Sequence, residues 1–133
     1  MDTTTGRLRV LLVDDSADTR LLLRIVLGLN PAFEVWGEAS NGEEAIALVT
    51  TSAPDAIVLD VMMPVMDGLT ALPLLRALCP ATPVIIMAST VTTEVRYEAF
   101  TRGAHTVLDK VAVFAQLPKV LLECLILEHS AAS

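Results

Sequence analysis

Hydrophobic positions fall into five short runs that are separated by longer mixed segments. Four of the runs are continuously apolar, at residues 8–13, 56–59, 84–88 and 106–108. Continuous runs of this length are typical of parallel strands that are covered on both faces. The fifth run, residues 33–39, alternates apolar and polar positions, which predicts a strand at the edge of a sheet.

Helical patterns separate these runs. They predict helices over residues 17–29, 43–52, 69–78, 92–102 and 114–129. Ser16 or Asp15 can cap the first helix, and Asn41 opens the second with an acidic first turn.

Proline and glycine mark several of the helix ends. Pro54 closes the second helix, and Gly103 stops the fourth. Pro73 lies inside the third pattern and is tolerated only in a first turn, where backbone amides lack intrahelical partners anyway. The third helix is therefore expected to start near Leu69 or Thr70.

Strand and helix alternate five times along the 133 residues, of which 53% are hydrophobic. Right-handed crossovers between parallel strands place helices on both faces of the sheet. The chain is predicted to form a single α/β domain, a doubly wound (βα)5 sandwich around a five-stranded parallel sheet.

Polar residues follow four of the five runs. They are Asp14, Asp15, Asp60, Ser89 and Lys110. Because parallel strands all point one way, these residues are expected at one edge of the sheet, where open α/β sheets bind their ligands. Asp60 is therefore expected to end the buried run at residues 56–59 so that its carboxylate faces the ligand-binding crevice at this edge.

Three converging carboxylates need a compensating positive charge. At an effective dielectric constant of about 20, two charges about 4 Å apart repel by roughly 4 kcal/mol. Lys110 supplies one positive charge, and a divalent cation would supply two more. With no His or Cys nearby, Mg2+ suits the oxygen ligands better than zinc does. A carboxylate left partly free of the metal could attack phosphorus and form an acyl phosphate.

Charge and cysteine content exclude several other classes of protein. The net charge is −7, and only two of the nine basic residues are lysines, which argues against direct nucleic-acid binding. Cys79 and Cys124 stand alone, as expected for reduced thiols in the cytoplasm. The acidic start of the chain and its interrupted apolar stretches predict neither an export signal nor a membrane span.

Three segments, LLVDDS, VLDVMMPVMDG and GAHTVLDK, occur in this order along the chain. Together they resemble the signature of two-component response-regulator receiver domains, the CheY-like superfamily, over residues 9–128. The resemblance implies the strand order 2-1-3-4-5. It also implies a receiver domain over residues 8–129 with flexible ends at 1–7 and 130–133.

The same resemblance assigns roles to individual residues. It implies that Asp60 accepts the phosphoryl group and that Asp14 and Asp15 hold Mg2+ together with Asp60 and the Met62 main-chain carbonyl. Lys110 would pair with the phosphoryl group. The expected donor is a phosphohistidine of a sensor histidine kinase or a phosphotransfer protein.

The sequence departs from the family at the positions that usually switch. Ala88 stands where the family has Thr or Ser, and Ser89 comes one residue later. Since neighbouring strand residues point to opposite faces, Ser89 replaces that hydroxyl only if the strand ends early or bulges. Val107 stands where the family often has an aromatic residue. Phosphate capture is thus expected to be intact, while the usual signal route is altered.

The first and fifth helices carry more apolar residues than one buried stripe needs. On the first these are Leu21, Leu22, Leu23, Ile25, Val26 and Leu27; on the fifth, Leu117, Val120, Leu121, Leu122, Cys124, Leu125, Ile126 and Leu127. A wide core could absorb the excess. Alternatively, part of it forms an exposed patch for a sensor kinase, an output domain or a second copy of the chain.

The sequence thus predicts a phosphoacceptor receiver domain that signals through protein contacts and is not itself an enzyme. One rival is a pseudo-receiver that binds partners without phosphorylation, motivated by Ala88 and Val107. Another is a magnesium-dependent phosphatase of α/β architecture. Such enzymes commonly carry a second acid two residues past the nucleophile, where this chain has Met62.

Overall fold

The structure, a computed structural model, describes residues 6–132, and for residues 126–132 only the course of the helix. Five strands are present, Leu8–Val13 (β1), Phe33–Ala39 (β2), Ala56–Asp60 (β3), Val84–Ala88 (β4) and Thr106–Asp109 (β5). Five helices alternate with them, Ala17–Gly28 (α1), Gly42–Val49 (α2), Gly68–Leu78 (α3), Thr93–Thr101 (α4) and Val113–Ala132 (α5). Every predicted element is present. Residues 1–5, within the segment expected to be flexible, lie outside the described residues.

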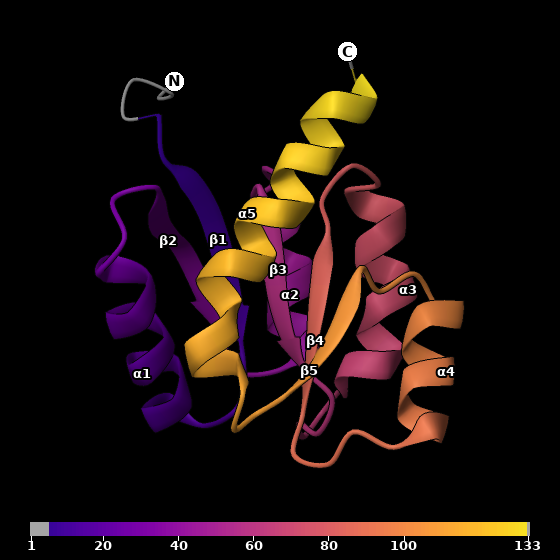
Figure 1. Cartoon of the computed structure of the whole chain (residues 1–133). Coiled ribbons are helices and arrows are strands. Elements are labelled where there is room, and N and C mark those ends of the chain that lie inside the picture. The colour runs from indigo at the N-terminus through magenta and orange to yellow at the C-terminus, as the bar shows by residue number, and fades with distance from the viewer. Residues whose placement is uncertain (1–5, 133) are drawn as a thin grey trace.

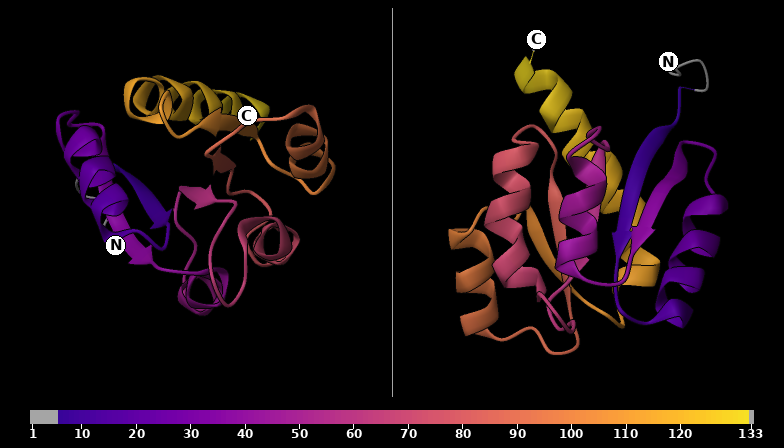
Figure 2. Two further views of the ribbon diagram at one scale, coloured as in Figure 1. Left: turned by 90° about the horizontal axis from the view of Figure 1, so that it is seen from below. Right: turned by 180° about the vertical axis from the view of Figure 1, so that it is seen from behind.

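All five strands run parallel in the order β2-β1-β3-β4-β5 (Figure 1). Helices α1 and α5 cover one face of the sheet, and α2, α3 and α4 cover the other (Figure 2). Alternate strand residues serve the two layers: Val58 packs toward α1 and α5, whereas Leu59 packs toward the opposite layer. The predicted doubly wound fold is confirmed.

The edge strand β2 carries a bulge. Val10 pairs with Val35, but the next residue, Leu11, pairs with Gly37, so Trp36 has no partner on β1. Because of this extra residue, Ala39 faces the α2 layer although Val35 faces the α1 layer. A bulge of this kind also discourages pairing with another exposed edge.

Helix ends are set by local side-chain hydrogen bonds. Ser16, rather than Asp15, caps α1 and accepts a hydrogen bond from the Thr19 amide at 3.2 Å. The second helix ends at Val49 rather than at residue 52, and the hydroxyl of Thr50 donates to a carbonyl of the last turn at 2.7 Å. Within the described residues, no helix has the length and apolar character that a membrane span requires.

The prediction that Pro73 lies in a first turn is wrong. Helix α3 begins at Gly68, which makes Pro73 its sixth residue. Proline has no amide hydrogen to donate to the Leu69 carbonyl one turn earlier. Instead the Arg102 guanidinium, at the end of α4, donates to this carbonyl at 2.8 Å. A side chain from another helix thus replaces the lost helical hydrogen bond.

Arg102→Ala is expected to lower the free energy of unfolding by about 1 kcal/mol, because the Leu69 carbonyl loses its donor. In a Pro73→Ala background the loss should be clearly smaller, since the introduced alanine brings its own amide hydrogen. Urea denaturation of the four proteins gives the coupling energy. The ion pair between Arg102 and Glu98 at 3.1 Å is present in both backgrounds and cancels. Equal losses in the two backgrounds would refute this role of Arg102.

Candidate functional site

The acidic site is assembled where three strands end. Asp14 follows β1, Asp60 is the last residue of β3, and Lys110 follows β5. Sheet hydrogen bonds continue into these positions: the Asp14 amide donates to the Ala39 carbonyl at 3.1 Å, and the Lys110 amide donates to the Ala88 carbonyl at 2.9 Å. The backbone of the sheet therefore fixes where the three side chains start.

The predicted side chains converge. Lys110 Nζ lies 2.8 Å from Asp14 Oδ2 and 3.1 Å from Asp60 Oδ2. Asp14 and Asp60 are buried, with 0% and 2% exposure. Asp15 is exposed, and one carboxylate oxygen from each of the three aspartates lies within 4.8 Å of the others. Residues far apart in the sequence thus form one cluster of three carboxylates and one ammonium group.

The charges in this cluster shift each other's ionisation. Burial raises the pKa of Asp60, and the negative charge of Asp14 raises it further. The hydrogen bond and charge of Lys110 and the Met62 backbone amide offset only part of this rise in pKa. Burial alone would lower the pKa of Lys110, but the adjacent carboxylates of Asp14 and Asp60 raise it overall. Lys110 is therefore positively charged at neutral pH.

The donor set fits a hard divalent cation. Asp14 Oδ1 accepts a hydrogen bond from the Ser16 amide at 2.8 Å. Among the described residues, Asp14 Oδ2 is buried and has no hydrogen bond of acceptable geometry, although Lys110 lies beside it. A buried carboxylate oxygen in this state, facing two further carboxylates, is suited to Mg2+, which binds oxygen ligands and retains several waters. The part assigned to the Met62 carbonyl stays a prediction.

Gly68 holds the loop behind Asp60. Its amide donates to the Val61 carbonyl at 2.9 Å, and a Cβ atom at Gly68 would lie 2.0 Å from the Asp60 carbonyl oxygen. Asp67 caps α3 by accepting a hydrogen bond from the Thr70 amide at 2.8 Å. Asp67 thus fixes the start of α3, and Gly68 sets how closely α3 approaches the end of β3. In the sequence, only the position of this glycine at the start of a helix indicated the close approach.

The altered switch positions lie in a regular strand. Ala88 and Val107 are buried at 3% and 5% exposure, both in the layer that faces α2, α3 and α4. Strand β4 pairs without a register shift with both β3 and β5. It ends at Ala88, so Ser89 is the first residue after the strand, and its side chain is exposed. No bulge brings the Ser89 hydroxyl into the place of Ala88.

Sequence reasoning missed one residue that contacts the site. The Arg20 guanidinium donates through Nη1 to the Asp14 carbonyl at 2.5 Å and through Nε to Glu38 at 2.9 Å. Arg20 lies one turn after the Ser16 cap, so its place near the start of α1 was visible. The contact itself depends on the side-chain conformation, which the sequence does not show.

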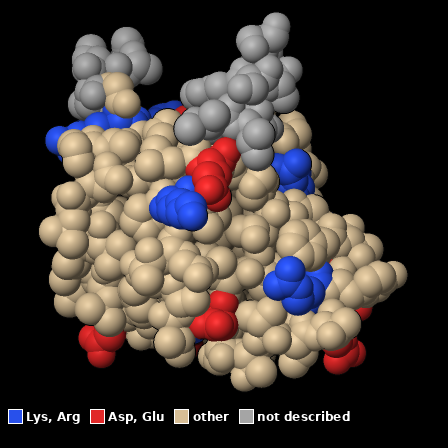
Figure 3. Space-filling view, in the orientation of Figure 1, with Lys and Arg blue, Asp and Glu red and all other residues tan. Residues whose placement is uncertain are grey.

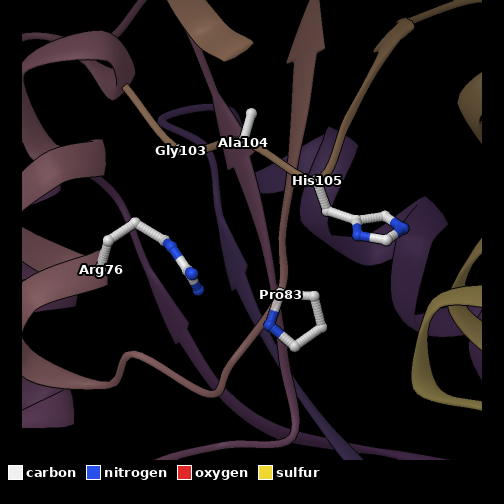
Figure 4. Close-up of a pocket in the computed structure, with 5 residues that line it drawn as sticks. All are labelled: Arg76, Pro83, Gly103, Ala104 and His105. Carbon is white, nitrogen blue, oxygen red and sulfur yellow. The ribbon is translucent and has the colours of Figure 1, made fainter. Parts of the chain in front are cut away.

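A separate pocket, drawn in Figure 4, lies where β4 and β5 begin, which is the opposite end of the sheet from the acidic site. It has a volume of about 200 Å³ and is lined by Arg76, Pro83, Gly103, Ala104 and His105. Arg76 donates to the Thr82 carbonyl at 2.7 Å, and the His105 ring points away from the Arg76 guanidinium. The two basic groups therefore do not converge on a common ligand position.

Lys110→Met tests the charge balance of the acidic cluster. Without Mg2+, the free energy of unfolding should fall by about 2 kcal/mol, because two buried carboxylates lose their positive partner. Added Mg2+ should make the difference in free energy of unfolding between this variant and the unmodified chain smaller. Lys119→Met, which removes an exposed charge from α5, serves as control and should change little. Urea unfolding in EDTA and in Mg2+ measures both effects, and a gap unchanged by Mg2+ would contradict this charge balance.

Comparison with known proteins gives consistent results. The family of response regulator receiver domains matches residues 10–122. The receiver of Thermotoga maritima CheB has a TM-score of 0.82 at 28% identity and covers 90% of this chain and 96% of that one. A CheY of Borrelia burgdorferi, solved as a CheX-CheY-BeF3-Mg2+ complex, has a TM-score of 0.75 at 27% identity and covers 90% and 94%.

Curated relatives are longer proteins. A protein-glutamate methylesterase/protein-glutamine glutaminase of Bradyrhizobium diazoefficiens is 39% identical over 120 residues, which are 89% of this chain and 32% of the relative. One from Methanosarcina acetivorans is 45% identical over 93 residues, 69% of this chain and 26% of the relative. The chain spans between 21 and 32% of the length of eight such relatives.

These names correct one prediction. The expectation that the chain is not an enzyme is wrong, because its relatives are named as enzymes. The receiver motifs point to the module that the chain contains, and they carry no information about a catalytic domain in the same protein. The fold, the acidic cluster and the family match over residues 10–122 agree on that module, and the chain belongs to the response regulator receiver domains of two-component systems.

Proposed function

We propose that the chain accepts a phosphoryl group from a phosphohistidine donor onto Asp60 in a reaction that requires Mg2+. The observation that carries this proposal is the position of the Lys110 ammonium, 2.8 Å from Asp14 and 3.1 Å from Asp60, in a cluster of three carboxylates. The donor would belong to a sensor histidine kinase or a phosphotransfer protein.

Each residue of the cluster has its own role in this reaction. A carboxylate oxygen of Asp60 attacks phosphorus, the bond to the donor nitrogen breaks, and an acyl phosphate remains on Asp60. Lys110 stays protonated and pairs with a phosphoryl oxygen as the Asp60 charge is transferred outward. Asp14, Asp15 and the Met62 carbonyl would hold Mg2+, which neutralises the phosphoryl oxygens when it is bound. The relative that was solved with Mg2+ and BeF3 supports this choice of metal.

The names of the relatives indicate which activity the receiver would regulate. These are protein-glutamate methylesterases, and this chain corresponds to a minor part of them. We infer that the phosphorylated receiver regulates a methylesterase of this class through protein contacts, within one chain or between chains. Both cysteines, Cys79 and Cys124, are buried, which fits a cytoplasmic location for such a system.

An apolar surface on α1 is available for a protein partner. Leu21, Leu22, Ile25 and Leu29 are exposed by 43, 49, 51 and 81%. The surface on the side of α1, at the left of Figure 3, is mostly uncharged. On α5, by contrast, Leu121, Cys124 and Leu125 are buried, while the side chains of Ile126 and Leu127 lie outside the described residues. The core therefore absorbs the described apolar excess of α5 better than that of α1, and we assign the α1 surface to the phosphodonor or an output domain.

Phosphorylation by a small donor tests the proposed function. The folded chain is incubated with acetyl phosphate or phosphoramidate in Mg2+, and its intact mass is measured. One added phosphoryl group is expected, and none in EDTA. No addition under either condition would favour the pseudo-receiver. Sustained hydrolysis of small phosphate esters would instead favour the phosphatase.

The altered switch predicts a local response to phosphorylation. Ala88 lacks the hydroxyl and Val107 lacks the aromatic ring of the residues that usually switch at these positions, and both are already buried. Amide resonances near Asp60 should therefore shift far more than those of Val107 and α4. Two-dimensional NMR spectra with and without acetyl phosphate measure this. Shifts of equal size at both places would show that the signal passes through β4 and β5 after all.

A further inference from the structure

Arg20 joins the acidic site to the edge strand. From the second turn of α1, its guanidinium reaches the Asp14 carbonyl through Nη1 at 2.5 Å and Glu38 Oε1 through Nε at 2.9 Å. The Arg20 side chain is 18% exposed and that of Glu38 26%. A planar guanidinium can hold both partners at once, because its donors point in fixed directions.

Glu38 in turn is held from both sides. Its second oxygen, Oε2, accepts from Arg24 Nη1 at 2.5 Å, so both carboxylate oxygens are occupied. Burial raises the pKa of Glu38, but hydrogen bonds and charges from Arg24 and Arg20 outweigh it and lower the pKa overall. Glu38 is thus ionised at neutral pH and orients Arg20. Among the contacts of the described residues, Arg24 has none with Asp14.

The Asp14 carbonyl belongs to the peptide group that joins Asp14 to Asp15. A hydrogen bond to this oxygen therefore fixes the plane from which both residues continue. The Asp14 amide donates to the Ala39 carbonyl at 3.1 Å, and Asp14 Oδ1 accepts a hydrogen bond from the Ser16 amide at 2.8 Å. With Arg20 on the carbonyl, the backbone of Asp14 is fixed on both sides, and Oδ2 is left facing the cluster.

We propose that Arg20 is a positioning residue for the acidic site. Oriented by Glu38, it fixes the Asp14–Asp15 peptide so that both carboxylates face one divalent cation, and it thereby sets the affinity for Mg2+. The inference rests on the proposed function, since it concerns the same metal-dependent site.

The alternative is that Arg20 only ties α1 to β2. Arg24 separates the two roles, because it lies one turn later on α1 and pairs with the same Glu38 carboxylate. Loss of Arg24 removes an ion pair between the same two elements but leaves the Asp14 carbonyl bonded. A purely structural role would therefore show in both variants, and a positioning role only in the Arg20 variant.

The experiment compares Arg20→Ala, Arg20→Lys and Arg24→Ala in the full chain. Mg2+ binding is measured by isothermal titration calorimetry, and unfolding by urea. Arg20→Ala should weaken Mg2+ binding about ten-fold, as loss of a group that orients a metal ligand does. Arg24→Ala should change it less than about two-fold. Arg20→Lys keeps the charge but cannot bridge both partners, so it should bind with intermediate affinity, and it stands in if Arg20→Ala fails to fold.

The rate of phosphorylation gives a second readout. At low Mg2+ the Arg20 variants should react more slowly with acetyl phosphate, and saturating Mg2+ should restore the rate. Unchanged Mg2+ affinity in Arg20→Ala, or an equal loss in Arg24→Ala, would overturn the positioning role. Failure of the unmodified chain to bind Mg2+ would overturn the proposed function itself, so the two failures are distinguishable.

Discussion

Asp60→Asn is expected to abolish phosphorylation by acetyl phosphate and to leave the fold intact. Asparagine has nearly the same shape but offers no carboxylate oxygen to attack phosphorus. Intact mass after incubation in Mg2+ should show no added phosphoryl group. The same variant should also be more stable than the unmodified chain by about 1 kcal/mol, because the raised pKa of Asp60 means that folding disfavours its charge.

The expected gain in stability of Asp60→Asn follows from proton binding. A carboxyl group whose pKa is raised on folding binds more protons in the folded than in the unfolded state, so stability falls as pH rises through the folded pKa. Asparagine removes this loss. Asp109→Asn is the matched control, since Asp109 precedes Lys110 at the same edge and its carboxylate accepts a hydrogen bond from the Ala112 amide at 2.7 Å. It should lose a little stability and still be phosphorylated. A phosphoryl group on Asp60→Asn would place the acceptor elsewhere.

Gly68→Ala should destabilise the chain by about 3 kcal/mol or more. The new Cβ atom would lie 2.0 Å from the Asp60 carbonyl oxygen and 2.8 Å from its carbonyl carbon. Both are backbone atoms of a buried strand, so no side chain can move aside. Helix propensity acts in the opposite direction, by about 1 kcal/mol in favour of alanine, and is too small to compensate.

Gly28→Ala provides the control for this effect. Gly28 is also in a helix, but a Cβ atom there would meet nothing within 4 Å. Its replacement should leave stability unchanged or raise it by up to about 1 kcal/mol. Urea unfolding of both variants measures the difference. If Gly68→Ala were as stable as Gly28→Ala, the close approach of α3 to β3 would not constrain the site.

The layers of the fold and the convergence of the acidic side chains with Lys110 could be predicted from the sequence for a physical reason. Continuous apolar runs report burial on both faces, and parallel strands bring their carboxyl ends to one edge. Asp60 and Lys110 are 50 residues apart, yet both follow directly from where β3 and β5 end. The placement of these residues required no knowledge of side-chain conformations.

Other features depend on contacts that no local pattern encodes. The start of α3 was misplaced because the helix keeps Pro73 in its second turn with the help of Arg102, which is 33 residues from Leu69. The contact between Arg20 and Asp14 depends in the same way on the orientation given by Glu38 on β2. In both cases an arginine satisfies a backbone carbonyl, and only the folded structure shows which arginine reaches which carbonyl.

The central claim is that the converged cluster directs a phosphoryl group to one side chain. Borohydride reduction after incubation with acetyl phosphate and Mg2+ tests it directly, because an aspartyl phosphate is reduced to homoserine. Peptide mapping by tandem mass spectrometry should then find homoserine at position 60 and, in EDTA, aspartate there. Homoserine at a different aspartate, or none in a protein that has gained a phosphoryl group, would contradict the account.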